Sequence, residues 1–269
     1  MEAETSRLVA EGLELRYDDR VVLAGLDLSV PDGRFSVIVG PNACGKSTLL
    51  RGLSRILRPH GGRVLLDGRA VHTMPAKQVA RILGMLPQSA TAPETITVLD
   101  LVGRGRFPHQ SLLRQWSDAD QLAVEQAMEA AGVTELADRP VDELSGGQRQ
   151  RAWLAMVLAQ QTELVLLDEP TTFLDISHQL DVLDLCAELV HDGYTVVAVL
   201  HDLNHACRYA DHLIAMVDGR VVASGPPTTV VTPELVAEVF GLACTIIPDP
   251  VTGTPMVVPA DRSRRSRGG

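Results

Sequence analysis

The hydrophobic pattern of the chain alternates between short apolar runs and segments with helical spacing. Three runs are apolar at nearly every position: RFSVIVG (34–40), ELVLLDEP (163–170) and YTVVAVLHD (194–202). Such runs are typical of strands that are buried on both faces of a parallel sheet. Between the last two runs, four apolar residues share one helical face: Leu180, Leu183, Ala187 and Val190. Buried strands separated by helices predict an α/β core with a mostly parallel sheet.

Two other segments depart from this alternation. Residues 8–30 carry the strand-like runs LELRY and RVVLAGLDLSV, closed by the turn PDG, which predicts an antiparallel β subdomain at the N-terminus. Residues 95–143 lack a buried strand and contain an apolar repeat of helical spacing at Val124, Ala127, Met128 and Ala131. We therefore expect one domain over residues 1–255, with an inserted helical subdomain at about 95–160 and a frayed C-terminal tail at 256–269.

The composition is that of an ordinary globular protein, with 45% hydrophobic and 22% charged residues. The net charge of −10 argues against nucleic acid as a partner, because such partners usually meet a basic face. Four cysteines without a C-x-x-C pair indicate a reducing compartment. We find no signal peptide in the acidic N-terminus, and no apolar run reaches the roughly 20 residues of a transmembrane helix. Any transport across a membrane would therefore require another chain.

A glycine-rich loop follows the first buried strand. The stretch GPNACGKST, residues 40–48, fits the pattern G-x-x-x-x-G-K-[ST] through Gly40, Gly45, Lys46 and Ser47. Between a strand and a helix, such a loop binds phosphate through its backbone N–H groups and the positive end of the helix. Lys46 adds a positive charge, and the hydroxyl of Ser47 can bind Mg²⁺. The loop predicts a nucleotide site.

Two positions of this loop are unusual. Ala43 stands where a further glycine is expected, and if the backbone there has positive φ, alanine costs about 1–2 kcal/mol. Cys44 lies near a helix N-terminus and a lysine, so we expect a lowered thiol pKa and inactivation by alkylating reagents.

Two adjacent carboxylates, Asp168 and Glu169, end the apolar strand LVLLDEP. Backbone alternation sends the two side chains in different directions. Asp168 can therefore face the metal, while Glu169 faces the water that attacks the γ-phosphate. By itself a DE pair after a strand is a common surface turn, but its combination with the phosphate loop indicates an enzyme that hydrolyses nucleotides.

A second anion site is predicted at LSGGQRQR, residues 144–151. Its glycines leave backbone N–H groups free at the start of a helix, beside the hydroxyl of Ser145. Alone, the stretch could be a glycine turn that caps a helix. Because one nucleotide needs only one such cradle, the simplest explanation is a head-to-tail dimer with ATP between the phosphate loop of one copy and this stretch of the other.

Together these motifs resemble the nucleotide-binding subunit of ATP-binding-cassette (ABC) transporters over nearly the whole chain. The stretch LVLLDE resembles the Walker B motif of that family. The Walker A motif is matched by the phosphate loop: Gly40, Pro41, Asn42, Ala43, Cys44, Gly45, Lys46, Ser47 and Thr48. The family signature is matched by LSGGQ, which includes Ser145, Gly146, Gly147 and Gln148.

Four single residues match further family motifs. TTFLD, which ends in Asp175, resembles the D-loop, and His201 in VLHD resembles the switch histidine. Gln88 in GMLPQ resembles the Q-loop glutamine, which senses the γ-phosphate and faces the membrane partner. Tyr17 stands where the family stacks an aromatic ring on adenine, although an aromatic residue at a strand end is as often part of the core.

The resemblance implies ATP and Mg²⁺ as cofactors. Lys46, Gln88, Glu169 and His201 would then carry the catalytic roles. Ser47, Gln88 and Asp168 would hold the metal. The partners would be a second copy of the chain, integral-membrane permease subunits and, indirectly, a substrate-binding protein. The location would be peripheral, at the cytoplasmic face of the cell (inner) membrane.

Finer resemblance narrows the transport class. Four stretches are similar to importer ATPases for ferric siderophores, especially of the ferric enterobactin type: TITVLDLVGRGRFPHQ, LDISHQ, HDLNHACRYADHLIAM and TIIPDPVTGTPMVVP. Importers of haem or vitamin B12 share parts of this pattern and stay open as alternatives. The resemblance places the segment around Arg104, Phe107 and Pro108 near the groove that receives a permease helix. The alternative interpretation is that the Phe–Pro pair packs locally.

Two other classes of protein are weighed against a transporter subunit. A soluble, non-transport ABC ATPase acting on DNA or ribosomes should show a coiled-coil insertion, a second cassette or a basic surface, and the sequence shows none of these. A P-loop kinase for a small substrate would leave LSGGQ unexplained.

Overall fold

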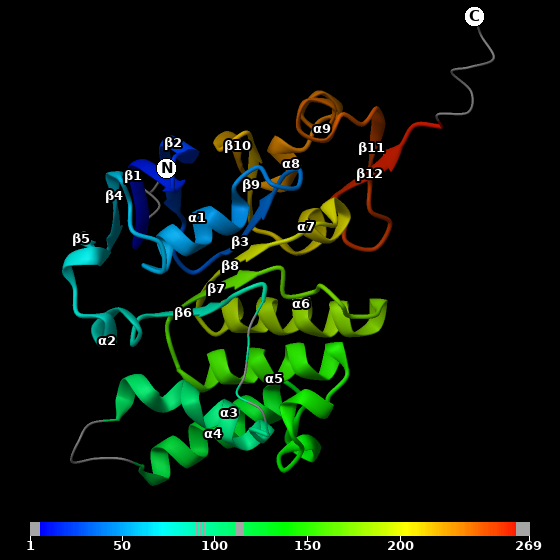
Figure 1. The fold of residues 1–269 in the computed structure, drawn as a ribbon. Coiled ribbons are helices and arrows are strands. Elements are labelled where there is room, and N and C mark those ends of the chain that lie inside the picture. The colour runs from blue at the N-terminus through cyan, green and yellow to red at the C-terminus, as the bar shows by residue number, and fades with distance from the viewer. Residues whose placement is uncertain (1–5, 90, 92, 94, 111–115, 262–269) are drawn as a thin grey trace, which may run out of the picture.

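A six-stranded, mostly parallel sheet forms the centre of the fold, in the strand order β10-β9-β3-β8-β7-β6 (Figure 1). The structure, a computed structural model, describes residues 6–89, 91, 93, 95–110 and 116–261. The strands are β3 (Phe35–Val39), β6 (Leu83–Leu86), β7 (Leu164–Asp168), β8 (Thr195–Val199), β9 (His212–Val217) and β10 (Arg220–Gly225). All neighbouring pairs are parallel except β9 and β10, which form an antiparallel edge. The predicted α/β class is confirmed, and the three apolar runs are β3, β7 and β8.

The N-terminal residues form a separate four-stranded sheet in the order β2-β1-β4-β5, whose described pairs are antiparallel. Its strands are β1 (Leu8–Tyr17), β2 (Arg20–Val30), β4 (Gly61–Leu66) and β5 (Arg69–Ala70). The short helices η1 (Val71–Thr73) and α2 (Ala76–Val79) lead from this sheet to β6. This arrangement confirms the predicted antiparallel subdomain.

Helices cover both faces of the central sheet, and β3 shows how its side chains divide between them. Phe35, Val37 and Val39 belong to a buried cluster with residues of α6 (Ile176–His191), α7 (Leu203–Tyr209) and α9 (Pro233–Phe240). Ile38 points to the opposite face, where it joins buried leucines of α1 (Lys46–Leu53) and of β1. The period of two along a strand therefore places β3 between two hydrophobic layers, which holds the loop at its carboxyl end in a fixed position.

A helical subdomain lies between β6 and β7 in the chain and packs below α6 in Figure 1. It contains α3 (Val98–Gly103), η2 (Arg104–His109), α4 (Asp118–Ala130), η3 (Thr134–Leu136), η4 (Val141–Glu143) and α5 (Gly146–Ala159). The predicted apolar stripe of α4 is confirmed, because Val124, Ala127, Met128 and Ala131 are all buried in one cluster with α3 and α5. Among the described residues, no helix combines the length and apolar character needed to cross a membrane.

The predicted buried face of α6 is wrong in part. Ala187 is exposed, whereas Val182, Leu183 and Cys186 are buried against the sheet. The prediction included Leu183 but placed the stripe about one position too far round the helix, because Val182 and Cys186 were not counted as core residues.

The C-terminal boundary at residue 255 also falls inside an ordered element. After α8 (Pro227–Val230) and α9, the chain forms a two-stranded antiparallel hairpin of β11 (Cys244–Pro248) and β12 (Pro255–Pro259). Figure 1 shows this hairpin beside α7. Residues 256–259, assigned to the tail, are thus part of a paired strand, and residues 262–269 lie outside the described residues.

Candidate nucleotide-binding site

The phosphate loop connects β3 to α1 and is shaped by positive φ angles. Gly40 has φ 153° and Gly45, the N-cap of α1, has φ 107°. A Cβ atom at Gly40 would collide with the carbonyl oxygen of Met216 on β9, so glycine is needed there for close approach as well as for conformation. Ala43 has φ 62°, in the left-handed region, which confirms the condition under which alanine strains the loop.

Lys46 starts α1 and folds back over the loop. Its side chain is only 5% exposed, and Nζ donates hydrogen bonds to the carbonyl oxygens of Gly40 at 2.8 Å and Pro41 at 2.9 Å. An ammonium group has three protons, so one stays available for a phosphate oxygen beside the free N–H groups of the helix start. The loop thereby fixes a positive charge at the point where an anion would bind.

Cys44 contradicts the expectation of a reactive thiol. Its side chain is buried below the loop in the cluster with the leucines of α1. This burial raises the pKa of the Cys44 thiol, and the opposing effect of the Lys46 charge is smaller. Position in the sequence suggested an electropositive surface, but the side chain points into the apolar layer instead.

Ser47 and Asp168 form the candidate metal site. The hydroxyl of Ser47 donates to Oδ1 of Asp168 at 2.8 Å, which joins the start of α1 to the end of β7. Asp168 is fully buried, and its Oδ2 atom has no hydrogen-bond partner among the described residues. Burial also raises the pKa of Asp168, against the hydrogen bond from Ser47, which lowers it. A buried carboxylate oxygen without a partner, next to a hydroxyl, fits a hard cation such as Mg²⁺.

Glu169 and His201 meet at the neighbouring ends of β7 and β8. Oε1 of Glu169 lies 2.7 Å from Nε2 of His201, and Oε2 accepts a hydrogen bond from Thr172 at 3.2 Å. Glu169 is 8% exposed and has φ 56°, a left-handed conformation that is rare outside glycine and occurs at functional sites. The turn after β7 therefore directs this carboxylate toward the residues that follow β8.

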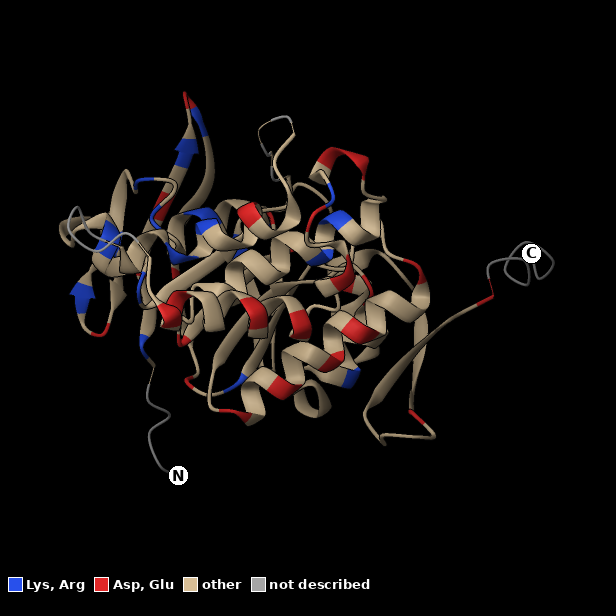
Figure 2. Ribbon diagram, turned by 90° about the horizontal axis from the view of Figure 1, so that it is seen from below, with Lys and Arg blue, Asp and Glu red and all other residues tan. Residues whose placement is uncertain are grey.

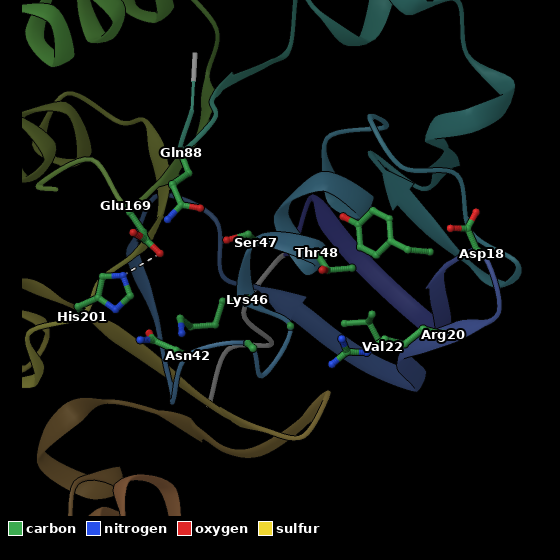
Figure 3. Close-up of a pocket in the computed structure, with 13 residues that line it drawn as sticks. Asp18, Arg20, Val22, Asn42, Lys46, Ser47, Thr48, Gln88, Glu169 and His201 are labelled. Carbon is green, nitrogen blue, oxygen red and sulfur yellow. Dashed lines mark ion pairs between the residues drawn. The ribbon is translucent and has the colours of Figure 1, made fainter. Parts of the chain in front are cut away.

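Residues of the phosphate loop and of the segments that follow β6, β7 and β8 line one open cleft of about 790 Å³ (Figure 3). Ten predicted residues line it: Tyr17, Asn42, Ala43, Gly45, Lys46, Ser47, Thr48, Gln88, Glu169 and His201. In Figure 3, Glu169, His201 and Gln88 lie at one end, and Lys46, Ser47 and Thr48 lie between them and the far end. The predicted catalytic residues are thus brought together by the ends of parallel strands.

Sequence reasoning missed three residues at the far end of the cleft: Asp18, Arg20 and Val22. They come from the tight turn between β1 and β2 and from β2 itself, next to Tyr17. Tyr17 is 40% exposed, and its hydroxyl accepts a hydrogen bond from Arg51 at 3.1 Å. The turn residues DDR directly after an expected base-stacking residue were the available signal.

The remaining predicted residues lie outside this cleft. Asp175 is the N-cap of α6, where its Oδ1 accepts from the backbone N–H of His178 at 3.0 Å. The LSGGQ stretch begins α5, and Ser145 and Gln148 cap the helix reciprocally. Within one chain, the second anion site and the phosphate loop therefore do not share a cleft.

The prediction against a nucleic-acid partner rests on charge and stays a prediction. In the view of Figure 2, acidic positions spread over the helices at the centre, and basic positions do not form a continuous stripe across them. A groove that binds the phosphate backbone of a nucleic acid needs such a stripe of basic residues.

Comparison with known proteins gives a consistent family assignment. Residues 23–172 match the protein family described as ABC transporter. The chain is 56% identical to the ferric enterobactin transport ATP-binding protein FepC of Escherichia coli (strain K12), over 99% of this chain and 98% of that protein. It is 52% identical to the probable siderophore transport system ATP-binding protein YusV of Bacillus subtilis (strain 168), over 96% of this chain and 94% of that protein.

A solved structure extends the similarity to three dimensions. The dimeric structure of MJ0796, a bacterial ABC transporter cassette, superposes with a TM-score of 0.74 and 26% sequence identity. The match covers 81% of this chain and 98% of that one.

Proposed function

This chain belongs to the ABC transporter family as an ATPase subunit, and we propose that it energises import of a ferric siderophore through a membrane permease. The transport class rests on sequence identity. The chain is more than 50% identical, over nearly its full length, to two ATP-binding proteins named for siderophore or ferric enterobactin transport. The observation that carries the chemistry is the cleft, where the phosphate loop, the metal site and the Glu169–His201 pair meet.

In the proposed mechanism, each phosphate-facing residue has one task. Lys46 holds the β- and γ-phosphates, and the N–H groups at the start of α1 support it. Ser47 and Asp168 would hold Mg²⁺, with the side-chain amide of Gln88 from the segment after β6 beside them. When bound, the ion would supply positive charge next to the phosphates. Glu169 accepts a proton from the attacking water, and His201, which lies beside Glu169, contacts the γ-phosphate. Catalysis is therefore positioning and electrostatic stabilisation, without a covalent protein intermediate.

Adenine binding is assigned to the far end of the cleft. The Tyr17 ring stacks on the base, and Arg51 restrains the ring through its hydroxyl. Arg20 contributes a positive charge close to the ribose and the α-phosphate end of the cleft.

A second copy of the chain completes the site. Because LSGGQ lies outside the cleft of its own protomer, we assign Ser145, Gly146, Gly147 and Gln148 to the ATP bound by the partner copy. We assign Asp175, the N-cap of α6, to the same interface. The similar cassette MJ0796 forms a dimer, which supports this arrangement.

The permease would dock on the helical subdomain. A groove of about 470 Å³ between α3, η2 and the start of α4 is lined by Leu99, Gly103, Arg104, Phe107 and Trp116, among others. Phe107 is 66% exposed and Trp116 48% exposed, and such aromatic side chains are common anchors of protein interfaces. Docking there would hold the protein at the cytoplasmic face of the membrane, with a substrate-binding protein acting on the permease from the other side.

The test is uptake of labelled chelates by cells that lack this chain. We expect loss of ferric siderophore uptake, rescue by the wild-type gene and no rescue by Lys46→Ala, while haem and vitamin B12 uptake stay normal. Loss of haem or vitamin B12 uptake instead would reassign the substrate. Normal uptake of all three classes, with no permease co-purifying, would favour a soluble ABC ATPase.

A further inference from the structure

Helix α7 directly follows His201 of the nucleotide cleft and leads into the C-terminal part of the chain. The helix starts at Leu203, and Asp202 caps it by accepting a hydrogen bond from the N–H of His205 at 2.9 Å. His201 precedes this cap directly. The position of the first turn of α7 therefore sets the position of His201 relative to Glu169.

The side chain of Asn204, in that first turn, clasps one residue of the C-terminal hairpin. Oδ1 of Asn204 accepts a hydrogen bond from the N–H of Val257 at 2.7 Å, and Nδ2 donates to the Val257 carbonyl oxygen at 3.3 Å. A primary amide that pairs with both backbone groups of one residue takes the place of a neighbouring strand. This pair of hydrogen bonds, called the clasp below, therefore fixes the orientation of α7 relative to β12 and its position along that strand.

Apolar packing also joins the hairpin to α7. Val257 is 6% exposed and lies in the same cluster as Ala206 and Cys207, which are fully buried on α7. At the far end of the helix, the hydroxyl of Tyr209 donates to Oδ1 of Asp184 on α6 at 2.7 Å. Among the described residues, side-chain hydrogen bonds tether α7 to other elements at Asn204 and at Tyr209, and the Asn204 tether lies next to His201.

The hairpin itself does not contribute to the nucleotide cleft. No residue from Cys244–Pro259 is among those that line it, and the hairpin lies beyond residues 23–172, which match the family. The two strands are nevertheless ordered, paired over their full length and attached to the helix that follows the proposed catalytic histidine. An attachment of this kind can affect the rate of hydrolysis without touching the nucleotide.

We propose that Asn204 is a positioning residue, through which the β11–β12 hairpin holds His201 in place for ATP hydrolysis. The inference rests on the function proposed above for His201. Since a displacement of about 1 Å in a catalytic group can cost about 100-fold in rate, a loosened first turn of α7 affects the chemical step. ATP affinity depends on the phosphate loop and Tyr17, which the clasp does not contact.

The test measures steady-state ATPase activity, single-turnover phosphate release and ATP binding on the full chain. Asn204→Leu keeps the side-chain volume and removes both hydrogen bonds. Asn204→Asp keeps the acceptor for the Val257 N–H but loses the donor. We expect kcat to fall about 10- to 100-fold in Asn204→Leu and less in Asn204→Asp, with the KM and Kd for ATP within about twofold of wild type.

Two comparisons separate positioning from a structural role. Hydrolysis by His201→Ala is expected to be slow, so it is measured by single-turnover phosphate release over hours. In this background, Asn204→Leu should cause no further loss of rate. Tyr209→Phe removes the other tether of α7 and should lower the thermal midpoint with little change in kcat. An unchanged kcat in Asn204→Leu, or the same fold-loss with and without His201, would overturn the proposal.

The outcome for His201 itself is read separately. If His201→Ala retains the wild-type kcat, the role assigned to His201 fails, and the positioning role of Asn204 fails with it. If His201→Ala is slow while both Asn204 variants are normal, only the positioning role fails. Should Asn204→Leu not fold, Asn204→Asp provides the same comparison with a smaller perturbation.

Discussion

Nε2 of His201 lies 2.7 Å from Oε1 of Glu169, so two groups proposed for ATP hydrolysis contact each other directly. The contact joins the ends of the adjacent parallel strands β7 and β8. The other carboxylate oxygen of Glu169 accepts a hydrogen bond from the hydroxyl of Thr172, so both oxygens have a neighbour and the orientation of the carboxylate is restricted.

Glu169→Gln should therefore separate binding from chemistry. Glutamine keeps the shape of the side chain but lacks the charge that activates water, so the rate of hydrolysis should fall about 10²–10⁴-fold. Ser47 and Asp168 are untouched, so MgATP should still bind and accumulate a stable dimer. Size-exclusion chromatography with and without MgATP, beside a phosphate-release assay, measures both effects.

Either of two results would contradict this assignment. Normal hydrolysis in Glu169→Gln would remove Glu169 from the mechanism. A variant that binds ATP but stays monomeric, even with its permease present, would count against the shared-site dimer.

Ala43→Gly should tighten ATP binding. The backbone at this position has φ 62°, where alanine costs about 1–2 kcal/mol and glycine does not. If part of this strain opposes closure of the loop on phosphate, Kd for ATP should fall by up to about tenfold, as measured by titration with a fluorescent analogue. Ala43→Val is the opposite control, since a β-branched residue is more strained there and should weaken binding. Equal affinities across the three variants would sink the strain argument.

Cys44 should resist alkylation in the folded protein. Its pKa is raised by burial, so at neutral pH it is a protonated thiol without access to solvent. Peptide mass spectrometry after iodoacetamide treatment should find modification first at Cys244, which is partly exposed, and at Cys44 only after denaturant is added. Rapid modification of Cys44 that MgATP prevents would show instead that the loop opens readily.

Tyr17→Ala should weaken binding of ATP but not of inorganic tripolyphosphate. Loss of one aromatic stacking contact costs about 0.5–1.5 kcal/mol, which corresponds to a rise in Kd of about 2- to 13-fold. Tyr17→Phe keeps the ring and loses only the hydrogen bond from Arg51, so its effect should be smaller. Equal losses for ATP and tripolyphosphate would mean that Tyr17 supports the fold of the cleft and does not contact the base.

Arg106→Met should destabilise the helical subdomain. The Arg106 guanidinium donates to Asp120 at 2.8 Å and to the carbonyl oxygen of Ala159 at 2.7 Å, in a position that is only 5% exposed. Removal of one partner of a buried ion pair costs about 3–5 kcal/mol, measurable by urea unfolding. The exposed pair of Arg63 and Glu11 provides the control, since Arg63→Met should cost less than about 1 kcal/mol. Equal losses in the two variants would refute the structural role of the buried pair.

Much of this architecture could be predicted from the sequence, because it depends on local patterns. Consecutive apolar residues identified β3, β7 and β8, and the spacing of glycines and Lys46 identified the loop that follows β3. Once these strands are parallel neighbours, their carboxyl ends must converge. The meeting of Ser47 with Asp168, and of Glu169 with His201, then follows from topology.

The errors concern features that depend on packing. Whether Cys44 faces solvent or the apolar layer is decided by the φ angles of the loop, which the motif does not specify. The face of α6 depends on which of Val182 and Ala187 meets the sheet, and both are apolar. The strand β12 was assigned to the tail because its partner is a short neighbouring strand and its anchor, Asn204, lies on a distant helix.

The separation of the LSGGQ stretch from the phosphate cleft of its own chain has a genetic consequence. A chain with Lys46→Ala keeps an intact Ser145–Gln148 stretch, while one with Ser145→Arg keeps an intact phosphate loop. Either allele alone would leave every ATP site of the homodimer defective. In a cell that expresses both, mixed dimers would contain one wholly intact site. Two inactive alleles of this one gene should therefore complement each other.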